Sequence, residues 1–237
     1  MSEPTPISAP ALSALEHELR ALCTCTEISL AAFSGASSWK DCEERLTSLI
    51  AADAFPALSL AHDVRHAPYL QNPSSGECRN LLLSLSDESD RLAAAWARAE
   101  EDSPLVGLGI DLCAAVRFET RPGRRDRAQL LLTERERALA PSLWPDNLPL
   151  AHATLFAAKE ASFKATAAPL RRWYEEHDDE LRYGVRHFVM DEPLAEHGTG
   201  RDGAAQRAIE AMGIARIEIR YARLDEMAIV TACALAY

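Results

Sequence analysis

The sequence predicts an α+β protein built as a pseudo-twofold pair of similar lobes, each a small antiparallel sheet with a packed long helix. Two observations lead to this prediction. A strand–turn–strand pattern at residues 81–97 resembles a second one at 215–236, and helical sequence precedes each of them. Two copies are too few for a solenoid, so one pseudo-dimeric unit is the simplest interpretation.

The elements of the first half follow from apolar spacing and turn residues. Leucines recur at helical spacing near the N-terminus, and a second apolar face follows a serine N-cap. A stretch with two prolines and a glycine then separates these helices from a change to strand-like patterning. We expect helices over 11–26 and 38–52, a loop over 63–80, a strand over 81–86, a turn over 87–90 and a returning strand over 91–97.

The second half mixes strands with two stronger helix signals. Thr133 with Glu136 three residues later is a capping-box pattern. We expect strands over 106–113 and 185–190, helices over 133–143 and 152–168, a polar irregular stretch over 171–203, and a hairpin of strands over 215–223 and 227–236. The lobes should join near Glu100–Pro104, giving an N-terminal lobe of residues 1–104 and a C-terminal lobe of residues 105–237.

Composition narrows the class of protein. The 237 residues are 48% hydrophobic and 26% charged, as in ordinary globular proteins. No apolar stretch approaches the roughly 18 residues of a membrane span, and no secretory signal is visible. The six cysteines form no metal-ligand spacing, so we expect reduced thiols in a cytoplasmic protein. The net charge of −11 disfavours nucleic acids and anionic membranes as partners.

One helical segment carries a carboxylate in an unusual setting. Phe156, Glu160 and Phe163 fall on one helix face, with Lys159 and Lys164 on either side. A carboxylate between two phenylalanines is costly to bury unless a cation or hydrogen-bond donors meet it. The alternative is an ordinary surface helix with a Glu160–Lys164 ion pair at i, i+4 spacing.

An apolar strand supplies a second carboxylate. Gly107 and Gly109 make this strand easy to approach closely, and Asp111 follows them. Asp111 and the helical Glu160 together suit a hard divalent cation such as Mg²⁺, which takes one or two protein carboxylates plus phosphates and water. The alternative is an aspartate that only begins the next turn.

In their order along the chain, these segments resemble the 4′-phosphopantetheinyl transferase superfamily. The resemblance covers residues 63–170 well, and its upstream part looks like the approach to the serine–histidine motif of the two-lobed, surfactin-type members. The motifs that carry it are Gly109-Ile110-Asp111, Leu132-Thr133-Glu134-Arg135-Glu136 and Phe156-Ala157-Ala158-Lys159-Glu160-Ala161-Ser162-Phe163-Lys164-Ala165.

The resemblance implies a transferase that moves the phosphopantetheine arm of coenzyme A onto a carrier-protein serine. Asp111 and Glu160 would be Mg²⁺ ligands, and Lys159 and Lys164 would face phosphate oxygens of coenzyme A. Glu160 and Lys164 would be the catalytic residues, with Glu160 or a water on the ion accepting the serine proton. Arg65 would hold the 3′-phosphate of the adenosine.

The resemblance also implies a partner, an acyl or peptidyl carrier protein of fatty-acid, polyketide or peptide synthesis. Arg117 matches an arginine that touches the carrier in the small holo-acyl-carrier-protein synthases. Carriers are generally acidic around the modified serine, so the basic stretch with Arg124 and Arg125 is the expected docking loop. Two lobes in one chain favour a monomer.

Three positions depart from the family pattern. Asp87 stands where a histidine is expected, Ala67 where a lysine is often found, and Cys113 where two-lobed members place a second acid. A thiol is a poor Mg²⁺ ligand. These departures leave two alternatives open: a non-catalytic transferase-like domain that binds a carrier or multienzyme partner, and an unrelated α+β enzyme.

Overall fold

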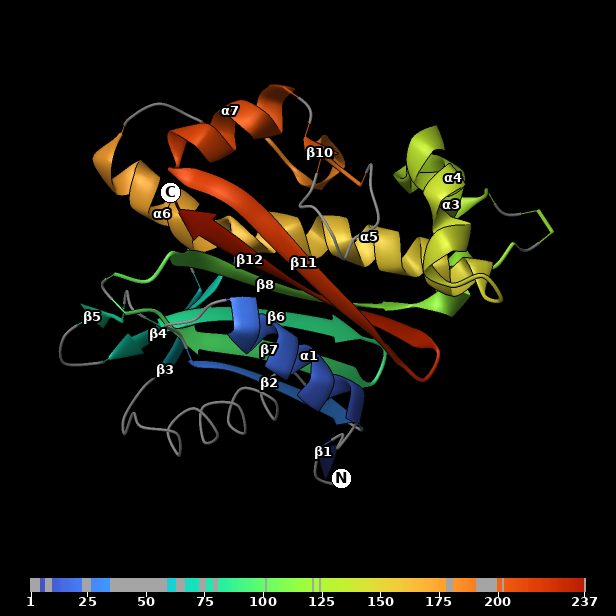
Figure 1. Ribbon diagram of the computed structural model, residues 1–237, viewed down its shortest axis with the longest axis horizontal. Helices are drawn as coiled ribbons and strands as arrows, with labels where there is room; N and C mark the ends of the chain where they lie inside the picture. Colours follow the sequence, from blue (N-terminus) through green and yellow to red (C-terminus); the bar gives the residue numbers. More distant parts are fainter. Residues whose placement is uncertain are drawn as a thin grey trace.

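The computed structural model describes most of the chain, namely residues 5–6, 10–22, 27–34, 59–62, 67–72, 76–78, 81–100, 102–120, 122–123, 125–177, 181–190, 200–201 and 203–236. Two antiparallel sheets form its centre (Figure 1). The N-terminal sheet has the order β1-β2-β7-β6, from strands Thr5–Pro6, Glu27–Ser34, Arg91–Arg98 and Leu81–Glu88. The C-terminal sheet has the order β11-β12-β8, from strands Ile214–Leu224, Met227–Ala236 and Leu105–Ala114.

The two sheets share one topology, which confirms the predicted α+β class with two similar lobes. In each, the first strand pairs antiparallel with the second strand of a later hairpin: β2 with β7, and β8 with β12. Both hairpins turn through two residues, and the first of these, Ser89 or Asp225, has a positive φ. Strand β2 was not predicted from the sequence, although it pairs along its full length with β7.

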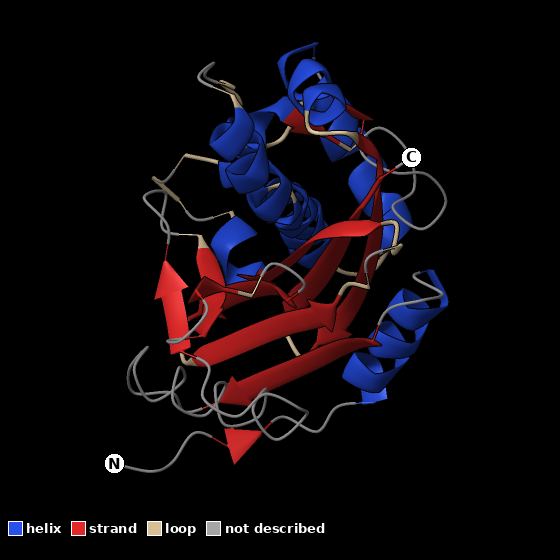
Figure 2. Ribbon diagram, turned by 90° about the vertical axis from the view of Figure 1, so that its left-hand side faces the viewer, coloured by secondary structure: helices blue, strands red, loops and turns tan. Residues whose placement is uncertain are grey.

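Helices and short elements cover the sheets. α5 (Leu148–Ala165) lies across the C-terminal sheet, and α1 (Pro10–Leu22) packs beside β2 and β11 (Figures 1 and 2). The remaining described elements are β3 (Ser59–His62), β4 (Pro68–Asn72), β5 (Gly76–Glu77), η1 (Ala115–Phe118), α3 (Arg127–Leu131), α4 (Glu134–Leu143), α6 (Ala167–Glu176), η2 (Val185–His187), β9 (Phe188–Val189), β10 (Gly200–Arg201) and α7 (Gly203–Ala211).

Several predicted boundaries need correction. The predicted loop over 63–80 contains β4 and β5, and the predicted strand over 185–190 divides into the 3-10 turn η2 and the short strand β9. The predicted helix over 152–168 begins earlier, where the side chain of Asn147 accepts a hydrogen bond from the Leu150 N–H (3.0 Å). The predicted capping box of Thr133 and Glu136 is present at the start of α4. The predicted helix over 38–52 lies outside the described residues.

One hydrophobic cluster joins both ends of the chain. It contains Leu15 of α1, Leu82 of β6, Leu108 and Leu112 of β8, and Leu235 of β12. A second cluster lies between α5 and the other face of the C-terminal sheet. Because the first cluster draws on both halves, the sheets share a core, and the division at residue 104 stays a prediction. In the described part of the chain, no helix has the length and apolar character needed to cross a membrane.

Candidate functional site

The site begins where α5 rests directly on β8. Gly107 and Gly109 face the helix, and a Cβ at either would lie 1.9 Å from a backbone oxygen, that of Ala165 or Ala161 respectively. Only glycine allows the two backbones to approach this closely. Side chains on one face of a strand recur every second residue, so Asp111 is the next to point toward α5.

Asp111 is almost completely buried, with 6% of its surface exposed. Its Oδ1 accepts hydrogen bonds from Lys164 Nζ (2.7 Å) and from the Ser86 hydroxyl (2.8 Å). Burial raises the pKa of the Asp111 carboxyl above its ordinary value of 3.8, while Lys164 and Ser86 act in the opposite direction. Both contacts fall on Oδ1, so Oδ2 has no hydrogen-bond donor among the described residues.

Two serines of β6 tie the N-terminal sheet to this site. The Ser84 hydroxyl accepts a hydrogen bond from the Ile110 N–H (3.0 Å), and the Ser86 hydroxyl accepts one from the Leu112 N–H (3.1 Å). These N–H groups lie on the edge of β8 that β12 does not occupy. The two serine side chains therefore connect β6 to β8 by hydrogen bonds, and this joint between the sheets holds Asp111 in place.

Glu160 lies one helical turn before Lys164 and is half-buried. Burial raises the pKa of the Glu160 carboxyl, and the charge of Asp111 raises it further; Lys164 and Arg117 lower it. Within the described part of the chain, Glu160 makes no hydrogen bond or ion pair, so the surface pair with Lys164 is not formed. Two carboxylates of like charge thus lie close together, and the lysine that pairs with one of them, Lys164, pairs with Asp111.

Arg117 of η1 borders the same place. Its Nη1 pairs with Glu88 Oε2 at the end of β6 (2.8 Å), and its guanidinium lies 5.5 Å from the centre of the Phe156 ring. It is close enough to influence the pKa of both Asp111 and Glu160. Arg117 therefore bridges the two sheets beside the carboxylates, and its pairing with Glu88 was not predicted.

Lys159 differs from the expectation that it faces phosphate oxygens. Its side chain is 2% exposed, and its ammonium group pairs with the fully buried Glu136 of α4 at 3.0 Å. Glu136 also accepts hydrogen bonds from the N–H groups of Thr133 (2.7 Å) and Met190 (3.0 Å). Adjacent residues on a helix point about 100° apart, so Lys159 faces α4 while Glu160 faces the strand. Lys159 therefore joins α5 to α4 through a buried ion pair, and it does not contact Asp111.

Cys113, in the place of a second acid, is fully buried. Burial raises the pKa of its thiol to about 12, so it stays protonated at neutral pH. Asp87, in the place of the expected histidine, is exposed at the end of β6. Arg65 and Arg124 lie outside the described residues. Ala67 directly precedes β4. Arg125 is exposed ahead of α3.

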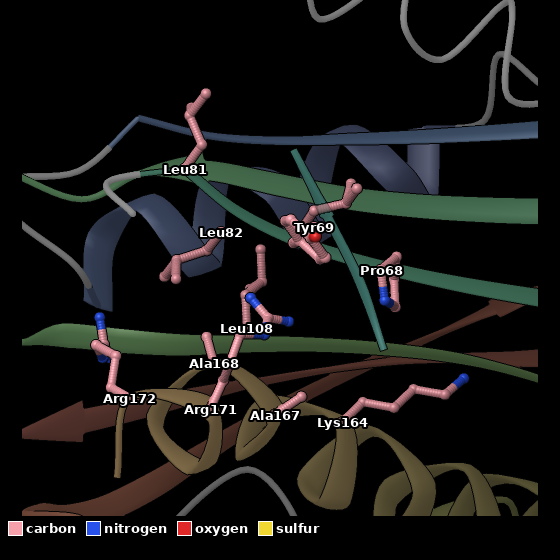
Figure 3. A pocket seen from close by; sticks show the side chains of 11 residues that line it. Pro68, Tyr69, Leu81, Leu82, Leu108, Lys164, Ala167, Ala168, Arg171 and Arg172 are labelled. Atoms are coloured by element: carbon pink, nitrogen blue, oxygen red, sulfur yellow. The ribbon is translucent and has the colours of Figure 1, made fainter. Parts of the chain in front are cut away.

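A cleft leads away from Lys164 between the two sheets (Figure 3). Figure 3 shows Lys164 at one end of this cleft and Arg172 at the other, with Tyr69 above Arg171. Arg171 and Arg172 were not predicted as site residues. The contact between β4 and α6 that forms this cleft joins segments far apart in the sequence. Its lining residues are Pro68, Tyr69, Leu81, Leu82, Leu83, Leu108, Lys164, Ala167, Ala168, Arg171 and Arg172.

Comparison with known proteins gives a family match and similar solved structures, two of which are described here. A model of the 4′-phosphopantetheinyl transferase superfamily matches residues 107–189. The chain is similar to the holo-[acyl-carrier-protein] synthase of Neisseria meningitidis, with 20% identity over 55% of this chain and 98% of that one and a TM-score of 0.41. It is also similar to the holo-ACP synthase of Plasmodium yoelii, with 17% identity over 56% and 96% and a TM-score of 0.35. No curated protein matches the chain.

The matched segment runs from the first glycine of β8 to the end of β9. It therefore contains Asp111, Glu160 and Lys164, the residues that meet between β8 and α5. The family match thus confirms, over residues 107–189, the resemblance to the 4′-phosphopantetheinyl transferase superfamily that the strand and helix motifs carry.

Proposed function

We propose that this protein transfers the 4′-phosphopantetheine group of coenzyme A to a serine of an acyl or peptidyl carrier protein. The observation that best supports this function is the meeting of Asp111, Glu160 and Lys164 at one end of a cleft. All three residues lie within the segment that matches the transferase family. An acidic pair beside a lysine suits chemistry on a phosphorylated substrate.

The residues present fit a divalent cation. Asp111 Oδ2 has no donor among the described residues, and the neighbouring Glu160 carboxylate has no described partner at all. Burial is the main cause that raises the pKa of both carboxyls, and the charge of Asp111 raises the pKa of Glu160 further. Hard carboxylate oxygens are the ligands that Mg²⁺ prefers, so Asp111 and Glu160 would hold it. When bound, the ion would supply positive charge to the pyrophosphate oxygens of coenzyme A.

Residues of the chain would orient the donor and accept the proton. Lys164 lines the cleft while touching Asp111, so its ammonium group is placed to bind a pyrophosphate oxygen and to orient the donor. The carrier serine oxygen forms a bond to the β-phosphorus, and the bond from that phosphorus to the bridging oxygen breaks. Adenosine 3′,5′-bisphosphate leaves. Glu160 would take the serine proton as the general base.

The carrier is proposed to dock beside η1 and α3. Four large apolar side chains are exposed there and at the start of α5: Val116, Leu130, Leu131 and Leu148. Leu130 is the most exposed of them, at 59%. Arg125 and Arg127 of the same segment are also exposed, which suits an amphipathic helix with acidic residues. We further propose that the protein acts in the cytoplasm as a monomer.

The function is tested by incubating the protein with coenzyme A, Mg²⁺ and an apo carrier protein and weighing the carrier by mass spectrometry. The carrier should gain one phosphopantetheine group. Glu160→Gln and Asp111→Asn should each lower turnover by about 100-fold or more, because charge stabilisation at the reacting phosphate is lost. The double variant should cost little more than either single one, because both groups act on one ion.

Glu176→Gln, which removes an exposed charge at the end of α6, is the matched control and should retain full turnover. Carrier binding without any mass gain across a panel of apo carriers would contradict the transferase. That outcome would favour the non-catalytic carrier-binding domain, consistent with Asp87, Ala67 and Cys113.

A further inference from the structure

An ion pair is buried between α4 and α5, and neither of its residues lines the cleft. The side chains of Lys159 and Glu136 are 2% and 0% exposed, and Lys159 Nζ lies 3.0 Å from Glu136 Oε1 and 3.1 Å from Oε2. Taking two charges out of water is costly, and a buried ion pair often stabilises a fold less than apolar side chains of the same volume do. Stability alone therefore does not explain this pair.

Glu136 connects three segments of the chain. Its Oε2 accepts a hydrogen bond from the Thr133 N–H (2.7 Å), which is part of the capping box at the start of α4. Its Oε1 accepts one from the N–H of Met190 (3.0 Å), the residue after β9. Each carboxylate oxygen thus accepts one backbone N–H and also contacts the ammonium group of Lys159 on α5. A buried polar network whose members are all satisfied favours one arrangement of its elements.

Lys159 extends this network to α3. Its Nζ lies 3.5 Å from the carbonyl oxygen of Leu131, the last residue of α3, where backbone carbonyls lack partners within the helix. The side chains of Leu131 and its neighbour Leu130 are exposed, and both belong to the surface proposed for carrier docking. One buried lysine of α5 therefore contacts both α4 and the end of α3.

The next residue after Lys159 is Glu160, the proposed general base. Adjacent helix residues differ by about 1.5 Å along the axis, so the ion pair attaches α3 and α4 to the turn of α5 that carries Glu160. A different contact holds Glu160 beside Asp111, namely the close backbone approach of α5 to β8 at Gly109. The ion pair can thus set the docking surface relative to Glu160 without forming the carboxylate pair itself.

We propose that Glu136 and Lys159 are positioning residues of the transfer reaction. They hold the docking surface of α3 at a fixed place relative to Glu160, so that the serine of a docked carrier reaches this carboxylate. Both side chains are buried, so they act through the placement of α3 and α4 and not by touching a substrate. A reactant displaced by about 1 Å can react about 100-fold more slowly. This inference rests on the proposed function for its choice of reaction.

The experiment uses the full chain with Lys159→Met and Glu136→Gln combined, because losing both charges together leaves neither one buried alone. The double variant should fold, and its kcat/KM for an apo carrier should fall by about tenfold or more. Its dissociation constants for Mg²⁺ and coenzyme A, measured by titration calorimetry, should stay within about twofold of the parent values. Hydrogen exchange should accelerate at the Leu130 and Leu132 amides and stay unchanged at the Ile110 amide of β8.

Two further variants complete this experiment. Lys159→Arg keeps the charge beside Glu136 and should retain part of the carrier turnover. Glu134→Gln is the matched control, because it removes the charge of an exposed glutamate on the same helix, and it should keep kcat/KM within about twofold.

The proposal is overturned if the double variant keeps the kcat/KM of the parent. It is also overturned if the double variant does not fold, or if exchange accelerates equally at α3 and β8 while all constants weaken together, because the pair then only stabilises the fold. A parent that modifies no carrier would contradict the transferase function instead. The affinity for a fluorescent apo carrier then decides: weaker binding by the double variant alone supports a positioned docking surface, and unchanged binding overturns it.

Discussion

Burial and charge act against each other at two acidic side chains of the site. Asp111 is buried but receives Lys164 and Ser86 on one oxygen. Glu160 is half-buried and faces Asp111 without a described partner of its own. A buried carboxylate that lacks a full counter-charge costs stability, and such groups cluster at functional sites. This unfavourable pair fits the cation site that we propose.

Replacing Glu160 with Gln is expected to raise the thermal unfolding temperature at neutral pH without Mg²⁺. Because the pKa of Glu160 is raised on folding, its stabilising contribution is complete below the ordinary value of 4.5 and is lost as pH rises through the folded-state pKa. Glutamine does not undergo this loss. Differential scanning calorimetry should therefore find a larger gain for Glu160→Gln at about pH 8 than at about pH 5.

Mg²⁺ provides the control for this measurement. Added Mg²⁺ should raise the unfolding temperature of the parent protein and leave that of the Glu160→Gln variant nearly unchanged, because a ligand that binds only the folded state stabilises it. A gain that is equal at both pH values, or a variant that still responds to Mg²⁺, would speak against an uncompensated Glu160 carboxylate.

At the scale of elements, the contact between β8 and α5 sets the position of every site residue. Gly109 lies so close to α5 that a methyl group would meet the Ala161 carbonyl oxygen at 1.9 Å. The opposing atom belongs to the helix backbone and has no rotamer with which to move aside. The whole helix would have to shift, taking Glu160 and Lys164 with it.

Gly109→Ala should therefore lower the free energy of unfolding by about 3 kcal/mol or more in urea and abolish carrier modification. Gly184→Ala is the matched control, because a Cβ there meets no atom within 4 Å and the backbone is extended. It should change stability by less than about 0.5 kcal/mol. Equal effects of the two substitutions would show that the close approach of α5 to β8 is not what limits stability.

The segment between η1 and α3 is expected to affect the binding of the carrier protein. Reversing Arg124 and Arg125 to Glu should raise the apparent KM for an acidic carrier and flatten its dependence on salt, while leaving the KM for coenzyme A nearly unchanged. Exposed charges at an interface mainly set the encounter rate and its screening by salt. Steady-state kinetics at two salt concentrations test this. An unaltered carrier KM at low salt would exclude this loop from docking.

At the scale of the whole molecule, the two sheets meet through side chains. Among the described residues, no strand pairs with the second edge of β8, and Ser84 and Ser86 of β6 accept hydrogen bonds from its Ile110 and Leu112 N–H groups. The hydrophobic cluster under this joint contains residues from both ends of the chain. The joint therefore couples the folding of the two lobes and places the carboxylates between them.

Ser84→Ala and Ser86→Ala should each cost about 1–3 kcal/mol, because each leaves a buried backbone N–H without an acceptor. Hydrogen exchange of the Ile110 and Leu112 amides should accelerate in the corresponding variant. Ser142→Ala, at an exposed serine of α4, is the control and should change stability by less than about 0.5 kcal/mol. Unchanged exchange at both amides would mean that the serines do not hold the joint.

Local sequence patterns alone determined the fold class and the positions of many helices and strands. The spacing of the apolar residues and the two hairpins predicted the α+β class and the repeated lobes, because the periods of helices and strands are local properties. The glycines before Asp111 and the phenylalanines around Glu160 predicted that one carboxylate on a strand and one on a helix come together. The capping box of α4 was likewise visible, since it needs only residues three apart in the chain.

Only the tertiary structure decided which partner each charged group meets. Lys159 and Lys164 look equivalent in the sequence, yet one pairs with the buried Glu136 and the other with Asp111. Arg171 meets Tyr69 across a cleft that no local pattern encodes. The period of a helix fixes the direction of a side chain relative to its neighbours on that helix, whereas the packing of distant elements fixes what lies in that direction.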